Sequence, residues 1–467
     1  MKRLVILAAP AVLSACSLAP RTQLPAAPVP ASWPEGDAYL AQSEADLPTV
    51  SFTRVFRDPR LQKLVETALA NNRDLRVAAA NLEAARAQVR VTRSAQFPEI
   101  GVSASASTTQ IGTGNSAVTS DLYQVQGGVS SFELDLFGKL TNATAAQRDR
   151  ALSTEAAART VRLGLVSDIA SAWATYAADR DLLAIAQGTA NVARESVRLT
   201  RARLDNGIAP RTDLSQAQQI LATAEGNIAV QKTALAQDVN LLRLLAGTEI
   251  DPALLPDSLA GIDTSFAALP AGLRSGVLLR RPDVVQAEYQ LRAANADIGV
   301  ARAQLFPSIS LTGLLGFASD ALSNLFAGGA FKATSAGDAS YSIFNAGGAR
   351  ANVKVSEAQR DAALATYEKA IQTAFREVSD ALATQGTLGE RLRAAHANTE
   401  AAATTARLTD ARYKGGIDSF LTSLVAQRSL YSARQSEVAV RLASVLNRVT
   451  LYRVLGGDQA TAEAGAN

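Results

Sequence analysis

The chain has 467 residues, a formal net charge of +3 and 5% aromatic residues. Removal of Lys2 and Arg3 with a signal segment leaves +1, so no basic surface argues for nucleic-acid binding. One histidine, His396, and one cysteine, Cys16, leave no plausible zinc cluster or hydrolytic triad. The sequence contains no Walker A pattern. We therefore expect a protein that is not an enzyme, has no cofactor or metal, and takes any energy for transport from a partner.

The N-terminus predicts export and lipidation. Lys2 and Arg3 precede an apolar stretch of about ten residues, which is too short to span a bilayer as a helix. The stretch ends in Leu-Ser-Ala-Cys, which resembles the bacterial lipobox. That resemblance implies a signal peptide over residues 1–15, acylation (palmitate) of Cys16, and sorting to the outer membrane because Ser17 follows. The alternative is an ordinary signal peptide followed by a buried free thiol. The proline-rich segment 16–56 is expected to be an extended, lipid-anchored tether.

A duplication dominates the mature chain. FPEIGVSAS at 97–105 matches FPSISLTGL at 306–314, and TRARLDNG at 200–207 matches TDARYKGG at 409–416. LLRLLAG at 241–247 matches LYRVLGG at 451–457. The offset stays near 209 residues, so the unit is too long for a solenoid repeat. We expect a first repeat over 57–256, a linker over 257–271, a second repeat over 272–457 and a flexible tail over 458–467.

Both repeats predict the same order of elements. A helical segment, 58–95 or 283–304, ends at a proline, because the residue before a proline disfavours the helical conformation. Two strands with alternating apolar residues follow each proline. A helix of roughly 100 Å and a returning helix complete each repeat. The expected strands are 99–111, 123–136, 308–318 and 330–344, and the turns at the membrane boundary are Phe97, Pro98, Phe306 and Pro307.

The returning helices have a period of 3.5 residues, which is typical of coiled-coil packing. In the first repeat the predicted seam starts at Leu214 and steps by three and four residues through Ala217, Ala224 and Asp238. In the second repeat the seam starts at Leu421 and includes the charged residue Arg428. Many seam residues are small, which lets helices approach closely.

The strand count predicts an oligomer. Four strands cannot close a barrel, and an open sheet edge does not occur in lipid. Eight strands from two chains would fill with side chains, whereas twelve strands from three chains would leave a lumen. The fold class is therefore mainly α with membrane β, in which long coiled-coil helices form a helical barrel and four strands per chain contribute to a trimeric β-barrel.

These features together resemble the TolC/OprM family of outer-membrane efflux factors, in its NodT-like lipoprotein branch. The residues that carry the resemblance are the Cys16 motif, the duplicated unit, the turns RLDNG and RYKGG, and AQRSLYSARQ at 426–435. The resemblance implies a homotrimer, anchored in the outer membrane by lipid and extending into the periplasm. It implies two protein partners, a periplasmic adaptor and an inner-membrane resistance-nodulation-division pump. The implied function is a passive channel for drugs or other small toxic compounds.

The same resemblance places the periplasmic end of the channel at segments 203–214 and 412–428, where helices turn. Glycines in both turns suit left-handed helix C-caps. Many family members carry an acid at the position of Val425, and Asp418 is a candidate substitute in a different register. The implied gate residues are Asp213, Tyr413, Asp418, Leu421 and Arg428, and the tip-turn residues are Asn206, Gly207, Gly415 and Gly416.

Alternatives remain at this point. Asp213 and Asp418 would instead cap helices, and Arg428 would set coiled-coil register, if the gate assignment were wrong. The tube would serve a type I protein secretion system, or the chain would be a structural coiled-coil lipoprotein, if the efflux assignment were wrong. The sequence does not identify the cargo.

Overall fold

The computed structural model describes residues 17–21, 24–30, 32–34, 51–112, 118–267 and 275–457. The chain divides into two compact units. Unit 1 contains residues 1–26, 80–156 and 285–369, and unit 2 contains residues 27–79, 157–284 and 370–467. Across the described residues, no helix combines the length and the apolar character needed to cross a membrane.

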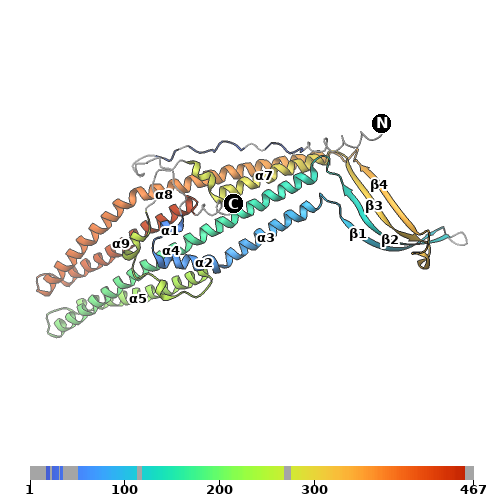
Figure 1. Cartoon of the computed structure of the whole chain (residues 1–467). Coiled ribbons are helices and arrows are strands. Elements are labelled where there is room, and N and C mark those ends of the chain that lie inside the picture. The colour runs from blue at the N-terminus through green and yellow to red at the C-terminus, as the bar shows by residue number, and fades with distance from the viewer. Residues whose placement is uncertain are drawn as a thin grey trace. The chain divides into compact units, whose positions relative to one another are not determined.

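Two equivalent runs of elements make up most of the chain (Figure 1). Each run has a helix, a two-stranded hairpin and two long helices. The first run consists of α3 (Arg73–Ser94), β1 (Ile100–Ile111), β2 (Val118–Glu133), α4 (Lys139–Asp205) and α5 (Arg211–Ala246). The second run consists of α7 (Pro282–Ala303), β3 (Ser308–Ser319), β4 (Phe331–Ser340), α8 (Gly348–Lys414) and α9 (Phe420–Val454). The short helices are α1 (Phe52–Val55), α2 (Pro59–Asn71), α6 (Leu259–Ile262), η2 (Pro252–Leu254), η3 (Asp263–Ser265), η4 (Ser275–Arg280) and η5 (Leu322–Asn324).

The helix expected over 58–95 is interrupted at Asn72, which separates α2 from α3. The Asn72 side chain accepts a hydrogen bond from Leu75 N at 3.0 Å and donates one to the Leu245 carbonyl at 2.9 Å. Asn72 is buried, so its side-chain amide needs these hydrogen-bond partners. The bond from Leu75 N caps the start of α3, and α2 therefore does not continue through Asn72. The pattern of apolar residues alone did not reveal this break.

Two strand boundaries also differ from the expected ones. The second strand, expected over 123–136, spans Val118–Glu133, because the Asp135 carboxylate accepts from Leu140 N and Thr141 N and starts α4. The fourth strand, expected over 330–344, ends at Ser340. Ser340 pairs with Ser308, the first residue of β3 after Pro307, so the chain beyond Ser340 has no neighbouring strand to continue the ladder.

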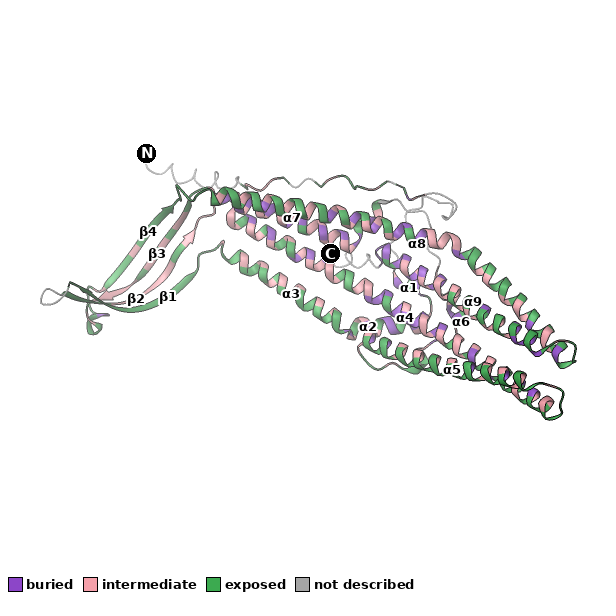
Figure 2. Cartoon of the chain, turned by 180° about the vertical axis from the view of Figure 1, so that it is seen from behind, coloured by how far each residue is buried: buried purple, intermediate pink, exposed green. Residues whose placement is uncertain are grey.

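The four strands form one antiparallel sheet in the order β1-β2-β3-β4. The two repeats therefore meet at the β2–β3 pair. Glycines allow a close approach there: a Cβ on Gly316 would lie 2.2 Å from the Val125 carbonyl oxygen, and one on Gly128 would lie 2.2 Å from the Gly313 carbonyl oxygen. Both outer strands, β1 and β4, are almost entirely exposed (Figure 2).

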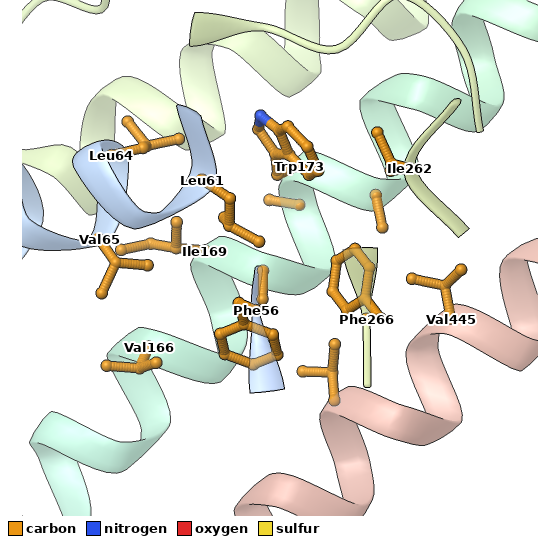
Figure 3. Packing of buried hydrophobic residues seen from close by; sticks show 14 of the residues in the cluster. Phe56, Leu61, Leu64, Val65, Val166, Ile169, Trp173, Ile262, Phe266 and Val445 are labelled. Atoms are coloured by element: carbon orange, nitrogen blue, oxygen red, sulfur yellow. The ribbon is translucent and has the colours of Figure 1, made fainter. Parts of the chain in front are cut away.

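The main apolar core lies in unit 2 (Figure 3). Phe56 is fully buried at its centre, with its ring 5.5 Å from that of Phe266 and 5.1 Å from that of Tyr452. Trp173 of α4 is also fully buried, and its Nε1 donates to the Leu254 carbonyl at 2.9 Å. The segment before the first repeat, the linker region and the helices α4, α5 and α9 thus share one core.

The predicted seams are confirmed along most of both returning helices. In α5 every predicted seam position from Leu214 to Leu245 is buried or half-buried. In α9 the seam is covered from Tyr431 onwards, but Leu421 is 55% exposed and Arg428 is exposed. The first turns of α9 therefore present seam residues that no other part of the described chain covers.

Phe56→Ala should destabilise unit 2, because it removes a fully buried ring and leaves a cavity between Phe266 and Tyr452. We expect a loss of about 3–5 kcal/mol in the free energy of unfolding. Glu66→Ala, at an exposed position of α2, should change it by less than about 0.5 kcal/mol. Thermal unfolding of the detergent-solubilised protein, followed by far-ultraviolet circular dichroism, measures both. Equal effects of the two substitutions would contradict this account of the core.

Candidate functional site

The two helical tips, formed by the α4–α5 turn and the α8–α9 turn, have the same backbone geometry. Gly207 and Gly416 have φ of 71° and 75°, the left-handed conformation expected of a helix C-cap. Ile208 N donates to the Arg203 carbonyl at 2.8 Å, and Ile417 N donates to the Arg412 carbonyl at 2.9 Å. The duplication thus extends to the hydrogen bonds of the turns. Asn206 and Gly415 immediately precede the two capping glycines, and the Asn206 amide donates to the Ala202 carbonyl.

Arg203 joins the two tips, and the sequence analysis did not select it. Its guanidinium donates to the carbonyls of Tyr413 at 3.1 Å and Lys414 at 2.9 Å. The same guanidinium lies 4.6 Å from the centroid of the Tyr413 ring. These contacts satisfy carbonyls at the C-terminal end of α8 and place a cation where the helix dipole favours one. We refer to the interaction of Arg203 with Tyr413 and Lys414 as the tip clasp.

Tyr413 is buried within this clasp, with 5% of its surface exposed. Its hydroxyl lies 3.2 Å from the Thr200 hydroxyl, and its ring centroid lies 5.3 Å from that of Phe420. Ala217 and Leu424 complete a small apolar cluster around it. Tyr413 therefore packs between the two helical pairs of its own chain.

Arg412 occupies the position in the second repeat that Arg203 has in the first, but it has a different partner. Its guanidinium forms a two-pronged ion pair with the Asp418 carboxylate, with distances of 2.7 and 3.0 Å. The hydrogen bond from Arg412 lowers the pKa of Asp418. The match between TRARLDNG and TDARYKGG contains both arginines, so the repeat itself was the signal that could have identified them.

The helix-cap alternative for the two aspartates is wrong. The N-cap of α5 is Pro210, and the N-cap of α9 is Ser419, whose side chain accepts from Thr422 N. Asp213 lies in the first turn of α5 and is half-buried. Asp418 precedes the cap residue and bonds to Arg412.

The remaining predicted tip residues lie on the first turns of α9. Leu421 and Val425 are 55% and 54% exposed. Arg428 lines a cavity of about 340 Å³ together with Asn227 and Tyr431. Within the part of the chain that the structure describes, Arg428 forms no ion pair. One chain thus brings Tyr413 and Asp418 into the same turn but does not join Asp213 or Arg428 to them.

The turns predicted to lie at the membrane boundary are also duplicated. Phe97 N donates to the Ser94 carbonyl at 3.0 Å, and Phe306 N donates to the Ala303 carbonyl at 3.1 Å. The backbone then passes Pro98 or Pro307 and becomes a strand. Phe306 stacks on Phe137 with ring centroids 4.5 Å apart. Cys16, the predicted lipidation site, lies outside the described residues, as do the predicted signal peptide and C-terminal tail.

A carboxyl pair lies between the first two long helices, Asp179 on α4 and Asp238 on α5. Burial and the Asp179 charge raise the pKa of Asp238 to about 6, and burial raises the pKa of Asp179. Asp238 Oδ2 is buried and has no other donor among the described residues. Below about pH 6 a proton on Asp238 removes the repulsion between the two carboxylates. Asp238 is the one ionisable residue among the predicted seam positions of α5. Its carboxyl is therefore protonated, and neutral, in solutions below about pH 6.

Known proteins share both the fold and the sequence pattern of this chain. The fold is that of bacterial outer-membrane channels: a crystal structure of CusC superposes with a TM-score of 0.85 at 35% identity, covering 95% of this chain and 100% of the CusC chain. Residues 64–248 and 273–457, one stretch in each repeat, match the model of the outer membrane efflux protein family. The chain belongs to this family.

Relatives of known name agree with this assignment. The toluene efflux pump outer membrane protein TtgC of Pseudomonas putida is 43% identical over 452 residues, which cover 96% of this chain and 93% of TtgC. The cation efflux system protein CusC of Escherichia coli is 35% identical over 447 residues, which cover 95% of this chain and 97% of CusC. The predicted efflux channel and its outer-membrane location are confirmed.

The raised pKa of Asp238 makes stability depend on pH. In the unfolded chain Asp238 has its ordinary pKa of 3.8, whereas in the folded protein it keeps its proton up to about pH 6. The free energy of unfolding should therefore fall as pH rises from about 4 to about 6. Asp238→Asn should remove this dependence and stabilise the protein at pH 8 by about 1–2 kcal/mol, after allowance for partial exposure. Asp257→Asn, at a side chain that is 90% exposed, is the matched control. Thermal unfolding of both variants between pH 4.5 and 8 measures the effect; parallel pH profiles would show that the carboxyl pair has no role.

Proposed function

We propose that the chain is one of three identical subunits of a passive conduit that carries small toxic compounds out of the cell. In this proposal a periplasmic adaptor and an inner-membrane resistance-nodulation-division pump deliver the cargo and supply the energy. The observation that carries the proposal is the four-stranded sheet, which has one apolar face, one polar face and two unpaired edges.

The pairing register separates the two faces. Residues that pair directly across an antiparallel ladder lie on the same face, and successive residues alternate. The row through Ala104 continues through Val125, Phe317 and Phe331. The neighbouring row through Ser103 continues through Gln126, Gly316 and Lys332. The apolar face therefore suits lipid, and the polar face suits a water-filled lumen.

The apolar residues of the first face come from all four strands. The register gives this face the following set: Ile100, Val102, Ala104, Ala106, Tyr123, Val125, Val129, Phe132, Ile309, Leu311, Leu315, Phe317, Phe331 and Ala333. Three charged side chains of the sheet, Glu133, Lys332 and Asp338, lie on the other face. Asp121 lies on the apolar face, near the turn end of the β1–β2 hairpin, where it accepts a hydrogen bond from Thr108. An apolar face of this kind is stable only when it contacts lipid or another protein surface.

The edges explain why several copies are needed. β1 and β4 run in opposite directions, so β4 of one copy placed beside β1 of the next continues the antiparallel alternation. Unpaired backbone groups are not tolerated in lipid, so the ring of copies must close. Two copies give eight strands, whose interior fills with side chains, and three copies give twelve strands with room for a lumen.

We place the gate at the helical tips. Leu421 and Arg428 are exposed in the single chain, so they are available to neighbouring copies or to the lumen. Asp213 lies in the opposite tip of the same chain, where it can bond to a neighbouring copy. The tip clasp and the Arg412–Asp418 pair hold each tip in shape, so that Tyr413 stays packed while copies move relative to one another. An adaptor that binds the open arrangement better would open the channel.

Lipidation at Cys16 belongs to the same proposal, with the acyl chains as an additional anchor in the outer membrane. The cargo is described only as a class. Relatives with the same fold are named for toluene and for cation efflux, so the pump partner, rather than this channel, is expected to select the compound.

The sheet assignment has a direct test. Ala104→Arg places a charge on the apolar face, which should cost about 2–4 kcal/mol if the position lies near the bilayer midplane. The variant should show little heat-resistant trimer on gels and a low level in outer-membrane fractions. Ser105→Arg, one residue along on the polar face, is the matched control and should assemble normally. A normal Ala104→Arg trimer together with a defective Ser105→Arg would reverse the two faces and refute the proposed lumen.

The gate assignment predicts a leakier channel when its charges are removed. Charge-assisted hydrogen bonds in a partly buried constriction stabilise the closed state by roughly 1.5–3 kcal/mol each. Asp213→Ala combined with Arg428→Ala should therefore raise the fraction of time that the channel is open by about tenfold or more. Single-channel recordings in planar bilayers measure this fraction and the conductance. Asp205→Ala combined with Arg434→Ala removes the same charges at other exposed positions and should leave conductance unchanged. An intact double-variant trimer with wild-type conductance would place the closure elsewhere.

A further inference from the structure

The first described residues of the mature chain do not lie free on the surface of unit 1. Ser17 Oγ donates to Asn142 Oδ1 at 2.8 Å, and Asn295 Nδ2 donates to the Pro20 carbonyl at 2.6 Å. A longer contact of 3.5 Å joins the Arg302 guanidinium to the Leu18 carbonyl. Residues 17–20 therefore interact with the start of α4 and with the last turns of α7.

The surface that receives them is built for close contact. Asn142 and Asn295 are each only 5% exposed. Gly299 is on α7, four residues after Asn295. A Cβ added to Gly299 would lie 2.6 Å from Asn142 Nδ2 and 2.9 Å from the Ala19 Cβ. Those distances are shorter than real Cβ contacts, so a side chain at position 299 would displace the docked segment or the Asn142 amide. The cleft thus depends on the absence of a side chain at Gly299.

One donor in this cleft has no partner. Asn142 Nδ2 is buried without a hydrogen bond among the described residues, although Asn142 Oδ1 accepts from Ser17. A buried donor that lacks a hydrogen-bond partner destabilises the folded state, because it has lost its contact with water. Residue 16, directly before Ser17, is the proposed acylated cysteine, whose amide-linked and ester-linked acyl groups carry carbonyl oxygens. These oxygens are acceptors of the kind that the Asn142 amide lacks.

We propose that Asn142, Asn295 and Gly299 form a binding site for the first residues after the lipidated cysteine, in which Asn142 also donates to a carbonyl oxygen of that cysteine's lipid. The inference rests on the proposed lipidation of Cys16. Asn142 is the fourth residue of α4, which begins six residues after the end of β2, and Gly299 lies one turn before the end of α7. The site therefore holds the acyl chains beside the helix-to-strand boundary, where the apolar face of the sheet starts.

The ligand that this site accepts has a defined chemistry. It is an uncharged, extended peptide with a hydroxyl at its first position and a small residue at its third. Ser17 supplies the hydroxyl, and Ala19 supplies the small side chain opposite Gly299. A larger residue at position 19 should be excluded for the same reason as a side chain at position 299.

Trypsin cleavage after Arg21 tests the docking in the full-length membrane protein. Residues 17–20 precede this bond, and a protease needs them free and extended, so docking should protect it. Cleavage then follows the open fraction of the segment. Release of the lipidated peptide 16–21, quantified by mass spectrometry, should be at least about tenfold faster in Gly299→Ala than in the wild type.

Matched variants separate docking from general effects on the helices. Gly226→Ala makes the same change within α5, where a Cβ would meet nothing within 4 Å, and should cleave at the wild-type rate. Asn295→Ala removes one hydrogen bond to Pro20 without adding volume, and it should also accelerate cleavage if Gly299→Ala fails to assemble. Equal rates in the wild type, Gly299→Ala and Asn295→Ala would overturn the proposed site.

Labelling with radioactive palmitate distinguishes this inference from the proposal on which it rests. The wild type and Gly299→Ala should label equally, and Cys16→Ser should not label. Label that persists in Cys16→Ser would refute lipidation at Cys16 and with it the role of the lipid carbonyl. Normal labelling combined with unprotected cleavage of the wild type would refute the docking site while leaving the lipid anchor in place.

Discussion

The two unpaired edges of the four-stranded sheet constrain the rest of the molecule. A sheet whose one face is apolar cannot remain open in lipid, because each free N–H and C=O group at its edges would lack a partner. The chain supplies two hairpins, one from each repeat, and joins them at β2–β3 through close glycine contacts. This arrangement pairs every internal edge of the sheet and leaves the outer edges of β1 and β4, which neighbouring copies would satisfy in the proposed assembly.

Unit 2 has a packing constraint of its own. In unit 2, the main core joins the segment before the first repeat to α4 and α9 around Phe56 and Trp173. Toward the start of α9 the seam includes the exposed positions Leu421 and Arg428. The Arg203 clasp joins the two tips of one chain. In the proposed gate, opening would therefore separate copies rather than unfold one of them.

The proposed docking site for residues 17–20 would add a second constraint on the position of the chain in the membrane. A flexible tether would place a lipid anywhere within its reach, whereas a docked tetrapeptide would hold it near the start of α4. The lipid and the apolar face of the sheet would then enter the same membrane leaflet together. The two shorter polar contacts are made by uncharged asparagines, and a longer one is made by the Arg302 guanidinium.

The sequence by itself determined the duplicated order of elements, the two Phe-Pro transitions, the seam period and the family, because each depends on local or periodic patterns that survive in one dimension. Strand ends, the break at Asn72 and the helix caps depended on partners distant in sequence, such as Leu245 for Asn72 and Ser308 for Ser340. The same reason explains why Tyr413 was selected as a tip residue while its partner Arg203 was missed. A tyrosine in a turn is visible in the sequence, but the cation over its ring comes from a helix in the other repeat. Only the tertiary structure decided that Asp418 pairs with Arg412 and that Gly299 makes room for Ala19, because both contacts depend on how side chains fill space between segments that the sequence does not place together.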